Sequence, residues 1–168
     1  MSNTEKIKHK ITTRQIGAIS TDRLLRDLIK QAVKMTLLSE SVNKPCVVNI
    51  LIADDKTIRS YNKKHRGIDK ATDVLSFPMQ NFSYTGWNGI IDIDIDMDTQ
   101  SVPLGDIIVS VQSIKQQARN YNHTMQHEAV RMIIHSTLHL LGYDHDNPKF
   151  EKVMEEKEES LLKYMGYV

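Results

Sequence analysis

Cysteine and long apolar runs are the two features that this sequence most clearly lacks. Its 168 residues contain one cysteine, Cys46, so no disulfide can form within the chain. No run of about 18 apolar residues occurs, and residues 2–14 are polar and charged, without the apolar core of a secretion signal. These absences exclude a disulfide-stabilised scaffold, and we expect a cytoplasmic protein with no membrane partner.

An excess of charge of either sign is also missing. The 22 lysines and arginines nearly balance 21 acidic residues, which leaves a formal net charge of +1. Global electrostatic attraction therefore does not point to nucleic acid, and any such contact must come from a local basic patch. The fractions of hydrophobic (40%) and charged (26%) residues are those of a soluble globular protein, which excludes a disordered or fibrous chain.

The chain is long enough for one hydrophobic core and shows no sign of a second. No internal repeat, low-complexity linker or shift of composition divides it. We predict a single domain over residues 1–168, of the α+β class, with a small mixed sheet of about four strands packed against several helices.

Capping residues and hydrophobic periodicity place the individual elements. One short strand is expected within residues 1–20. N-cap residues followed by helical patterns predict five helix starts, at Thr21, Asp54-Asp55, Ser110, Thr124 and Asn147. The second helix should run to about Lys64, and the fourth should end at Gly142. Apolar or alternating runs predict strands over 46–53, 72–78 and 106–111.

Residues 79–104 form the one long irregular region, and it is acidic. Isoleucine and aspartate alternate from Ile91 to Asp96, followed by Met97 and Asp98. This alternation predicts an exposed edge ribbon with the acids outward, where they would block aggregation. A cation site is the weaker interpretation, because the segment lacks the glycine and bidentate glutamate of a calcium loop.

Residues 135–145 contain three histidines in a spacing suited to one metal ion. His135 and His139 lie one turn apart on the same face of a helix. Gly142 stands where a helix end needs a residue in the left-handed conformation, so the chain turns back and His145 becomes a third ligand. Three imidazoles with an open fourth position suit zinc, which lowers the pKa of a bound water to about 7. The alternative is that the three histidines make ordinary hydrogen bonds and bind no metal.

The same spacing is found in the metzincin protease signature, with one important difference. Ser136 occupies the position of the glutamate that serves those proteases as general base. A serine hydroxyl has a far higher pKa and cannot replace it, so a peptidase function loses its proton acceptor. His123 and His127 are also one helical turn apart, but no third ligand follows them, and we interpret them as surface residues.

Three segments of the chain resemble the YbeY family of bacterial rRNA maturation factors, which are single-domain metal-dependent endoribonucleases. The histidine segment 135–145 is similar to the family signature. Residues 61–78, which end in Thr-Asp-Val-Leu-Ser-Phe-Pro, resemble its second motif, and residues 104–107 resemble a third. Ser136 stands where the family commonly has glycine, and segment 79–104 is acidic and longer than usual. Neither departure removes a ligand.

The resemblance implies roles for individual residues. It implies a zincin-like metal helix in which His135, His139 and His145 hold one divalent metal ion, with zinc expected. It further implies that Arg66 and His135 are catalytic. Guanidinium suits this role, because it is a permanently charged bidentate donor to phosphate oxygens.

Arg66 also belongs to the densest basic patch of the chain, Lys63-Lys64-His65-Arg66 with Lys70 nearby. Without the resemblance, a solvated helix end would explain this patch equally well. With it, we expect Arg66, Lys63, Lys64 and Lys70 to bind RNA. Asp144 is a candidate to orient one of the ligand histidines without binding the metal itself. Asp73 stays open between that role and a cap or turn.

The implied function is a single-strand-specific endoribonuclease in rRNA maturation, at the 3′ end of 16S rRNA, and in ribosome quality control. Its partners would be single-stranded rRNA and ribosomal particles or ribosomal proteins. Two rivals remain at this point. One is a metal-stabilised ribosome assembly factor with no catalysis of its own, and the other is a metallopeptidase, which Ser136 disfavours.

Overall fold

The computed structural model of the chain describes residues 7–167 and has the mixed architecture that the sequence predicts. Within these residues there are four strands, five α-helices and one short 3-10 helix. The strands are β1 (Lys10–Ile16), β2 (Cys46–Ala53), β3 (Val74–Pro78) and β4 (Val102–Ser110). The helices are α1 (Arg23–Ser39), α2 (Asp55–Arg66), η1 (Trp87–Gly89), α3 (Val111–Asn120), α4 (Met125–Leu140) and α5 (Pro148–Tyr164).

The four strands form one sheet in the order β1-β2-β4-β3. Strands β1, β2 and β4 run parallel, and β3 pairs antiparallel with β4 at the edge. The α+β class with a mixed four-stranded sheet is therefore confirmed. Strand β4 begins at Val102, earlier than the predicted residue 106, because a bulge opposite Val47 and Val48 lets the strand continue across Leu104 and Gly105.

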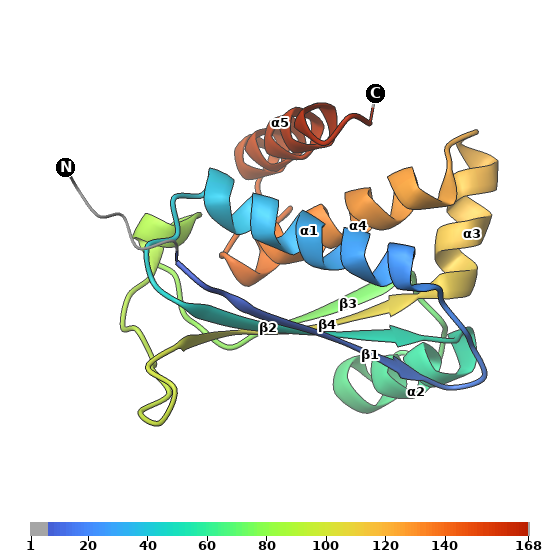
Figure 1. Cartoon of the computed structure of the whole chain (residues 1–168), viewed down its shortest axis with the longest axis horizontal. Coiled ribbons are helices and arrows are strands. Elements are labelled where there is room, and N and C mark those ends of the chain that lie inside the picture. Colours follow the sequence, from blue (N-terminus) through green and yellow to red (C-terminus); the bar gives the residue numbers. More distant parts are fainter. Residues whose placement is uncertain (1–6, 168) are drawn as a thin grey trace.

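The helices lie in layers on the two faces of the sheet (Figure 1). Helices α1 and α4 cover one face, α5 lies farther out beyond them, and α2 lies on the opposite side. The main core fills the space between the sheet and α1, α3 and α4. A smaller apolar cluster lies under α2 and contains Ala53, Ile58, Leu75 and Ile108.

Helix α4 is the central helix of the larger layer. Ten of its sixteen residues are buried, including Ile133, Ile134 and Leu138. A helix that is apolar on most of its surface must lie inside the protein, so α4 has little freedom to shift. Any side chain on its remaining face is held in a well-defined position.

The predicted helix starts are confirmed at four of five N-caps. Asp54, Ser110, Thr124 and Asn147 each accept a hydrogen bond from a backbone N–H of the first turn. Thr21 was the wrong choice for α1. The adjacent Asp22 caps that helix by accepting from the Leu25 N–H at 2.8 Å, and the backbone N–H of Thr21 is bonded to the Gln15 side chain.

The predicted edge ribbon at 91–98 is wrong. In residues 79–101, all of which the structure describes, only the short helix η1 and two isolated bridges form, and there is no strand. The buried Gln80 amide instead holds the segment, since it accepts from the Asp94 N–H at 3.0 Å and donates to the Pro103 carbonyl at 2.8 Å. The isoleucines at 93 and 95 pack partly against the core. The four aspartates are exposed, as expected.

None of the helices in residues 7–167 combines the length and apolarity needed to cross a bilayer.

Gly142 directly after α4 has the left-handed backbone conformation that the sequence predicts, with φ +86°. A Cβ placed there would lie 2.7 Å from the Cβ and Cγ of Phe82. We expect Gly142→Ala to lower the free energy of unfolding by about 3 kcal/mol, through backbone strain and overpacking together. Urea denaturation measures this value.

Gly67→Ala is the matched control for that substitution. Gly67 also has a positive φ, of +71°, but a Cβ there meets nothing within 4 Å. Gly67→Ala should therefore lower the free energy of unfolding by only the backbone contribution, about 1 kcal/mol. Equal losses in the two variants would contradict the proposed contact with Phe82.

Candidate metal centre

Helix α4 and the turn that follows it bring the three predicted histidines together. His135 and His139 are on the face of α4 that is not covered by the core. The helix ends at Leu140, Leu141 caps it with a backbone N–H, and the chain reverses at Gly142. This reversal carries His145 back to the pair.

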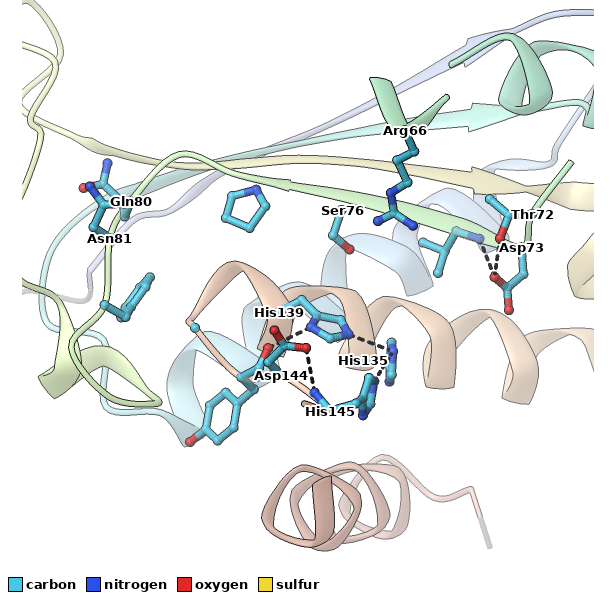
Figure 2. A pocket seen from close by; sticks show the side chains of 15 residues that line it. Arg66, Thr72, Asp73, Ser76, Gln80, Asn81, His135, His139, Asp144 and His145 are labelled. Carbon is cyan, nitrogen blue, oxygen red and sulfur yellow. Dashed lines mark hydrogen bonds between the residues drawn. The ribbon is translucent and has the colours of Figure 1, made fainter. Parts of the chain in front are cut away.

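The three imidazoles point their Nε2 atoms at one another (Figure 2). The Nε2 atoms of His135 and His139 are 3.0 Å apart, and those of His135 and His145 are 3.3 Å apart. Ligand atoms of all three lie within 4.8 Å of one another. Zinc–nitrogen bonds of about 2.0–2.1 Å in a tetrahedral site require nitrogen separations of about 3.3 Å. The donor set therefore fits a divalent metal ion with a free fourth position.

The opposite ring nitrogens of two histidines are held by acceptors. His135 Nδ1 lies 2.6 Å from Oε1 of Glu158, and His139 Nδ1 lies 2.7 Å from the backbone carbonyl of Tyr143. A carbonyl oxygen only accepts, so His139 Nδ1 carries the hydrogen, and the Glu158 carboxylate sets the same tautomer in His135. Both Nε2 lone pairs are then free to bind a metal.

Burial favours the neutral form of His139. The pKa of His139 is lowered, first by burial and then by the nearby His135. A histidine must be neutral to coordinate a metal through its ring nitrogen, so this shift keeps His139 available as a ligand.

A cavity of about 570 Å³ opens over the histidines. Helix α4 and the following loop form one wall, and strand β3 with the end of α2 forms the other. Figure 2 shows the side chain of Arg66 pointing from the sheet side of the cavity toward the three histidines. The polar lining residues of that facing wall are Arg66, Thr72, Asp73, Ser76, Gln80 and Asn81.

The lysines of the basic patch lie outside this cavity. Arg66 is among the lining residues, whereas Lys63, Lys64 and Lys70 are not. Lys63 pairs with Asp69 at 3.0 Å. The pKa of Asp69 falls to about 2 because Arg59 and Lys63 both donate to it.

The two candidate carboxylates contact backbone and amide groups. Asp144 accepts from the backbone N–H of His145 at 2.7 Å, so it shapes the loop that carries this ligand and does not touch its ring. Asp73 accepts from the Val74 N–H and, at 2.9 Å, from the side chain of Gln117. It ties the start of β3 to α3.

Glu158 is the site residue that sequence reasoning missed. It lies in a run of glutamates and lysines on α5, a pattern that is typical of a solvent-exposed helix face. Its neighbours Glu155, Glu156 and Glu159 are exposed, but Glu158 is turned partly inward. Its position four residues after Met154 and three before Leu161 places it on the apolar face of α5, but only the packing of α5 on α4 decides that it meets His135.

His123 and His127 lie apart from the metal centre and do not line its cavity. Their rings stack at a centroid distance of 4.0 Å. His123 is exposed, as expected, whereas His127 is half-buried and packs against the ring of Tyr167. Burial and the adjacent His123 lower the pKa of His127.

Ser136 points away from the cavity into the core. It is fully buried, and its hydroxyl has no hydrogen-bond partner among residues 7–167. The position that carries the general base in metzincins is therefore outside the reactive space of this protein.

Metal binding through the three histidines predicts a specific thermal shift. Zn²⁺ at about 100 times its dissociation constant should stabilise the protein by about 2.7 kcal/mol, which raises Tm by about 5–10 °C for a domain of this size. His139→Ala should abolish most of this shift, because it removes one ligand. His127→Ala, on the same helix but outside the site, should keep it. If Zn²⁺ raised the Tm of His139→Ala as much as that of the original protein, the assignment of His139 as a ligand would be contradicted.

The unpaired hydroxyl of Ser136 predicts a stabilising substitution. Ser136→Ala removes a buried polar group without an acceptor and should raise the free energy of unfolding by about 1 kcal/mol, with zinc affinity unchanged. Urea denaturation and a zinc titration measure the two effects. Thr137→Val is the control, since the Thr137 hydroxyl donates to the Ile133 carbonyl at 2.7 Å and no gain is expected. A loss of stability in Ser136→Ala would contradict this interpretation.

Comparisons with known proteins identify the family of this chain. A family model described as endoribonuclease YbeY matches residues 9–166. A relative from Acetivibrio thermocellus, named endoribonuclease YbeY, is 41% identical over 149 residues, which cover 87% of this chain and 89% of the relative. A relative of the same name from Caldanaerobacter subterraneus is 40% identical over 142 residues, which cover 84% of this chain and 88% of the relative.

A solved structure supports the fold. The solution structure of a Thermotoga maritima protein matches with a TM-score of 0.55 at 22% identity and covers 94% of this chain and 91% of that one. At this identity, the likeness concerns the fold alone. The family model and the relatives together show that this chain belongs to the YbeY family.

Proposed function

We propose that this chain is a single metal-dependent hydrolase domain that cleaves single-stranded RNA in the cavity between α4 and β3. One observation carries the proposal. Three Nε2 atoms meet at one point, and a guanidinium faces them across the same cavity. This arrangement joins a cation site to a fixed phosphate donor, which is what hydrolysis of a phosphodiester needs.

The reaction class follows from the family. Relatives that are 40–41% identical over most of their length are named endoribonucleases, so RNA is the substrate and its phosphodiester bonds are cut. The finer assignment is our proposal. It comprises maturation of the 3′ end of 16S rRNA, ribosome quality control, contact with ribosomal particles or proteins, and a cytoplasmic location.

The metal that we propose is zinc. Three neutral imidazoles are a donor set that zinc prefers, and two of them are already set in the required tautomer. When bound there, zinc supplies a Lewis acid beside the scissile phosphate. His135, His139 and His145 would hold it.

Arg66 is proposed to bind the phosphate. Its guanidinium presents two parallel N–H donors that match two phosphate oxygens, and it faces the histidines from the opposite wall. Donors placed before the reaction stabilise the negative charge that grows on the phosphate as the bond breaks. His135 is proposed as the second catalytic residue, at the centre of the donor set.

The patch of exposed lysines beside Arg66 is proposed to bind phosphates along the strand. Lys64 and Lys70 are exposed, and the ion pair of Lys63 with Asp69 is exposed as well. An exposed pair contributes little stability, so a phosphate replaces the carboxylate at small cost. A cavity of about 570 Å³ suits one nucleotide of an unpaired strand, whose bases are free to turn outward.

Arg66→Ala tests the proposal on single-stranded RNA. We expect kcat/KM for cleavage to fall about 100-fold, because a preplaced donor to the transition state is lost. Arg66→Lys should recover only part of the activity, since lysine has no bidentate fork. Arg119→Ala on α3, exposed and outside the cavity, should cleave normally. Cleavage is followed on gels with end-labelled RNA, with and without a chelator.

The same assay separates the two rivals. Cleavage that persists after chelation and in both His139→Ala and Arg66→Ala would overturn the proposal. Absence of cleavage together with intact binding to ribosomal particles would indicate an assembly factor. Metal-dependent cleavage of peptides with RNA left intact would indicate a peptidase, which the buried Ser136 makes unfavourable.

A further inference from the structure

We propose that helix α5 positions the metal centre: Glu158 orients His135, and the adjacent Lys157 holds, through Glu40 and Tyr143, the carbonyl that orients His139. The proposal rests on the metal site proposed above. It gives the C-terminal helix a role in metal affinity in addition to its packing.

The first path is a direct contact. Oε1 of Glu158 lies 2.6 Å from His135 Nδ1, and only 13% of the Glu158 side chain is exposed. A carboxylate in this position accepts the Nδ1 hydrogen, fixes the rotation of the ring and increases the basicity of Nε2. A partly buried carboxylate is expensive unless it is hydrogen-bonded, and the Nδ1–H of His135 is a donor that this structure provides.

The second path begins one residue earlier on the same helix. Lys157 Nζ lies 2.6 Å from Oε1 of Glu40, whose side chain is 5% exposed. The hydroxyl of Tyr143 donates to the other carboxylate oxygen of Glu40 at 2.8 Å. Lys157 Nζ also lies 5.5 Å from the centroid of the Tyr143 ring. These contacts hold Tyr143 against α5 and the end of α1.

Tyr143 connects this second path to the metal centre. Its backbone carbonyl is the acceptor, at 2.7 Å, for His139 Nδ1. The position of the Tyr143 carbonyl therefore depends on the contacts of the Tyr143 side chain, which α5 holds in place.

The spacing of residues on α5 makes both contacts possible at once. Met154 and Leu161 are the buried anchors of the helix. Lys157 and Glu158 lie three and four residues from each of them, and so occupy the same inward face. Two consecutive side chains of one docked helix thus act on two different ligands.

A purely structural role for α5 makes a different prediction. If Glu158 only held α5 in place, its loss would lower the free energy of unfolding and leave the folded protein with its full affinity for metal. A positioning role predicts that the folded protein itself binds metal less tightly. Zinc affinity and the ring nitrogens of His135 are therefore the informative measurements.

The central experiment compares variants of the full chain in their affinity for Zn²⁺, measured by competition with a chromophoric chelator. Glu158→Ala removes the acceptor and should weaken binding about 10- to 100-fold. Glu158→Gln retains an oxygen acceptor and should restore most of the affinity. Glu159→Ala, the exposed neighbour, is the matched control and should bind like the original protein.

Nitrogen-15 shifts of the His135 ring, recorded without metal, give a second readout. The Nδ1–H tautomer should dominate in the original protein and in Glu158→Gln, and mix with the other tautomer in Glu158→Ala. Tyr143→Phe removes the bond to Glu40 and should weaken zinc binding less than tenfold, because the carbonyl itself remains. In the double variant, the two fold-losses of zinc affinity should multiply, since the two substitutions act on different ligands.

Unchanged zinc affinity in folded Glu158→Ala would overturn the proposal, as would absence of zinc binding by the original protein. If Glu158→Ala does not fold, Glu158→Leu fills the volume without an acceptor and is judged by the same criterion. Failure of the RNA proposal looks different. The original protein would then bind zinc and leave RNA intact, while the order of affinities among the Glu158 variants stays as expected.

Discussion

An imidazole can direct its Nε2 lone pair at a metal only when its Nδ1 carries the hydrogen, and an acceptor at Nδ1 fixes both that tautomer and the rotation of the ring. The metal centre depends on this constraint. The Tyr143 carbonyl satisfies it for His139, and the Glu158 carboxylate satisfies it for His135. Without these acceptors the rings turn freely, and three histidines on neighbouring turns do not amount to a site.

The acceptors lie in fixed positions because the surrounding elements are packed on α4. That helix is buried on most of its surface, so the backbone positions of His135 and His139 are fixed. Gly142 allows the tight reversal that brings Tyr143 and His145 back over the helix end. The rigid sheet carries β3, and with the end of α2 it holds the facing wall of the cavity, so Arg66 faces a preformed donor set.

Local sequence signals were sufficient for some elements and misleading for others. Caps at Asp54, Ser110, Thr124 and Asn147 are interactions within a few residues, and all four were predicted correctly. The alternation at 91–98 was interpreted as a strand, and it is not one, since no neighbouring strand pairs with it and Gln80 binds its backbone instead. The first residues of β4 were missed because the bulge at Leu104 depends on the partner strand.

The sequence by itself determined the ligand set of this protein: a helical spacing of four, a glycine that ends the helix and a third histidine just beyond it are all contacts within eleven residues. Only the tertiary structure decided which groups complete the site. Glu158 lies 23 residues from His135, Glu40 lies 103 from Tyr143, and Lys157 lies 117 from Glu40. Such pairs form through the docking of α5 and α1 around α4. Helical periodicity places Glu158 on the inward face of α5, but it does not determine which residue of another element Glu158 meets.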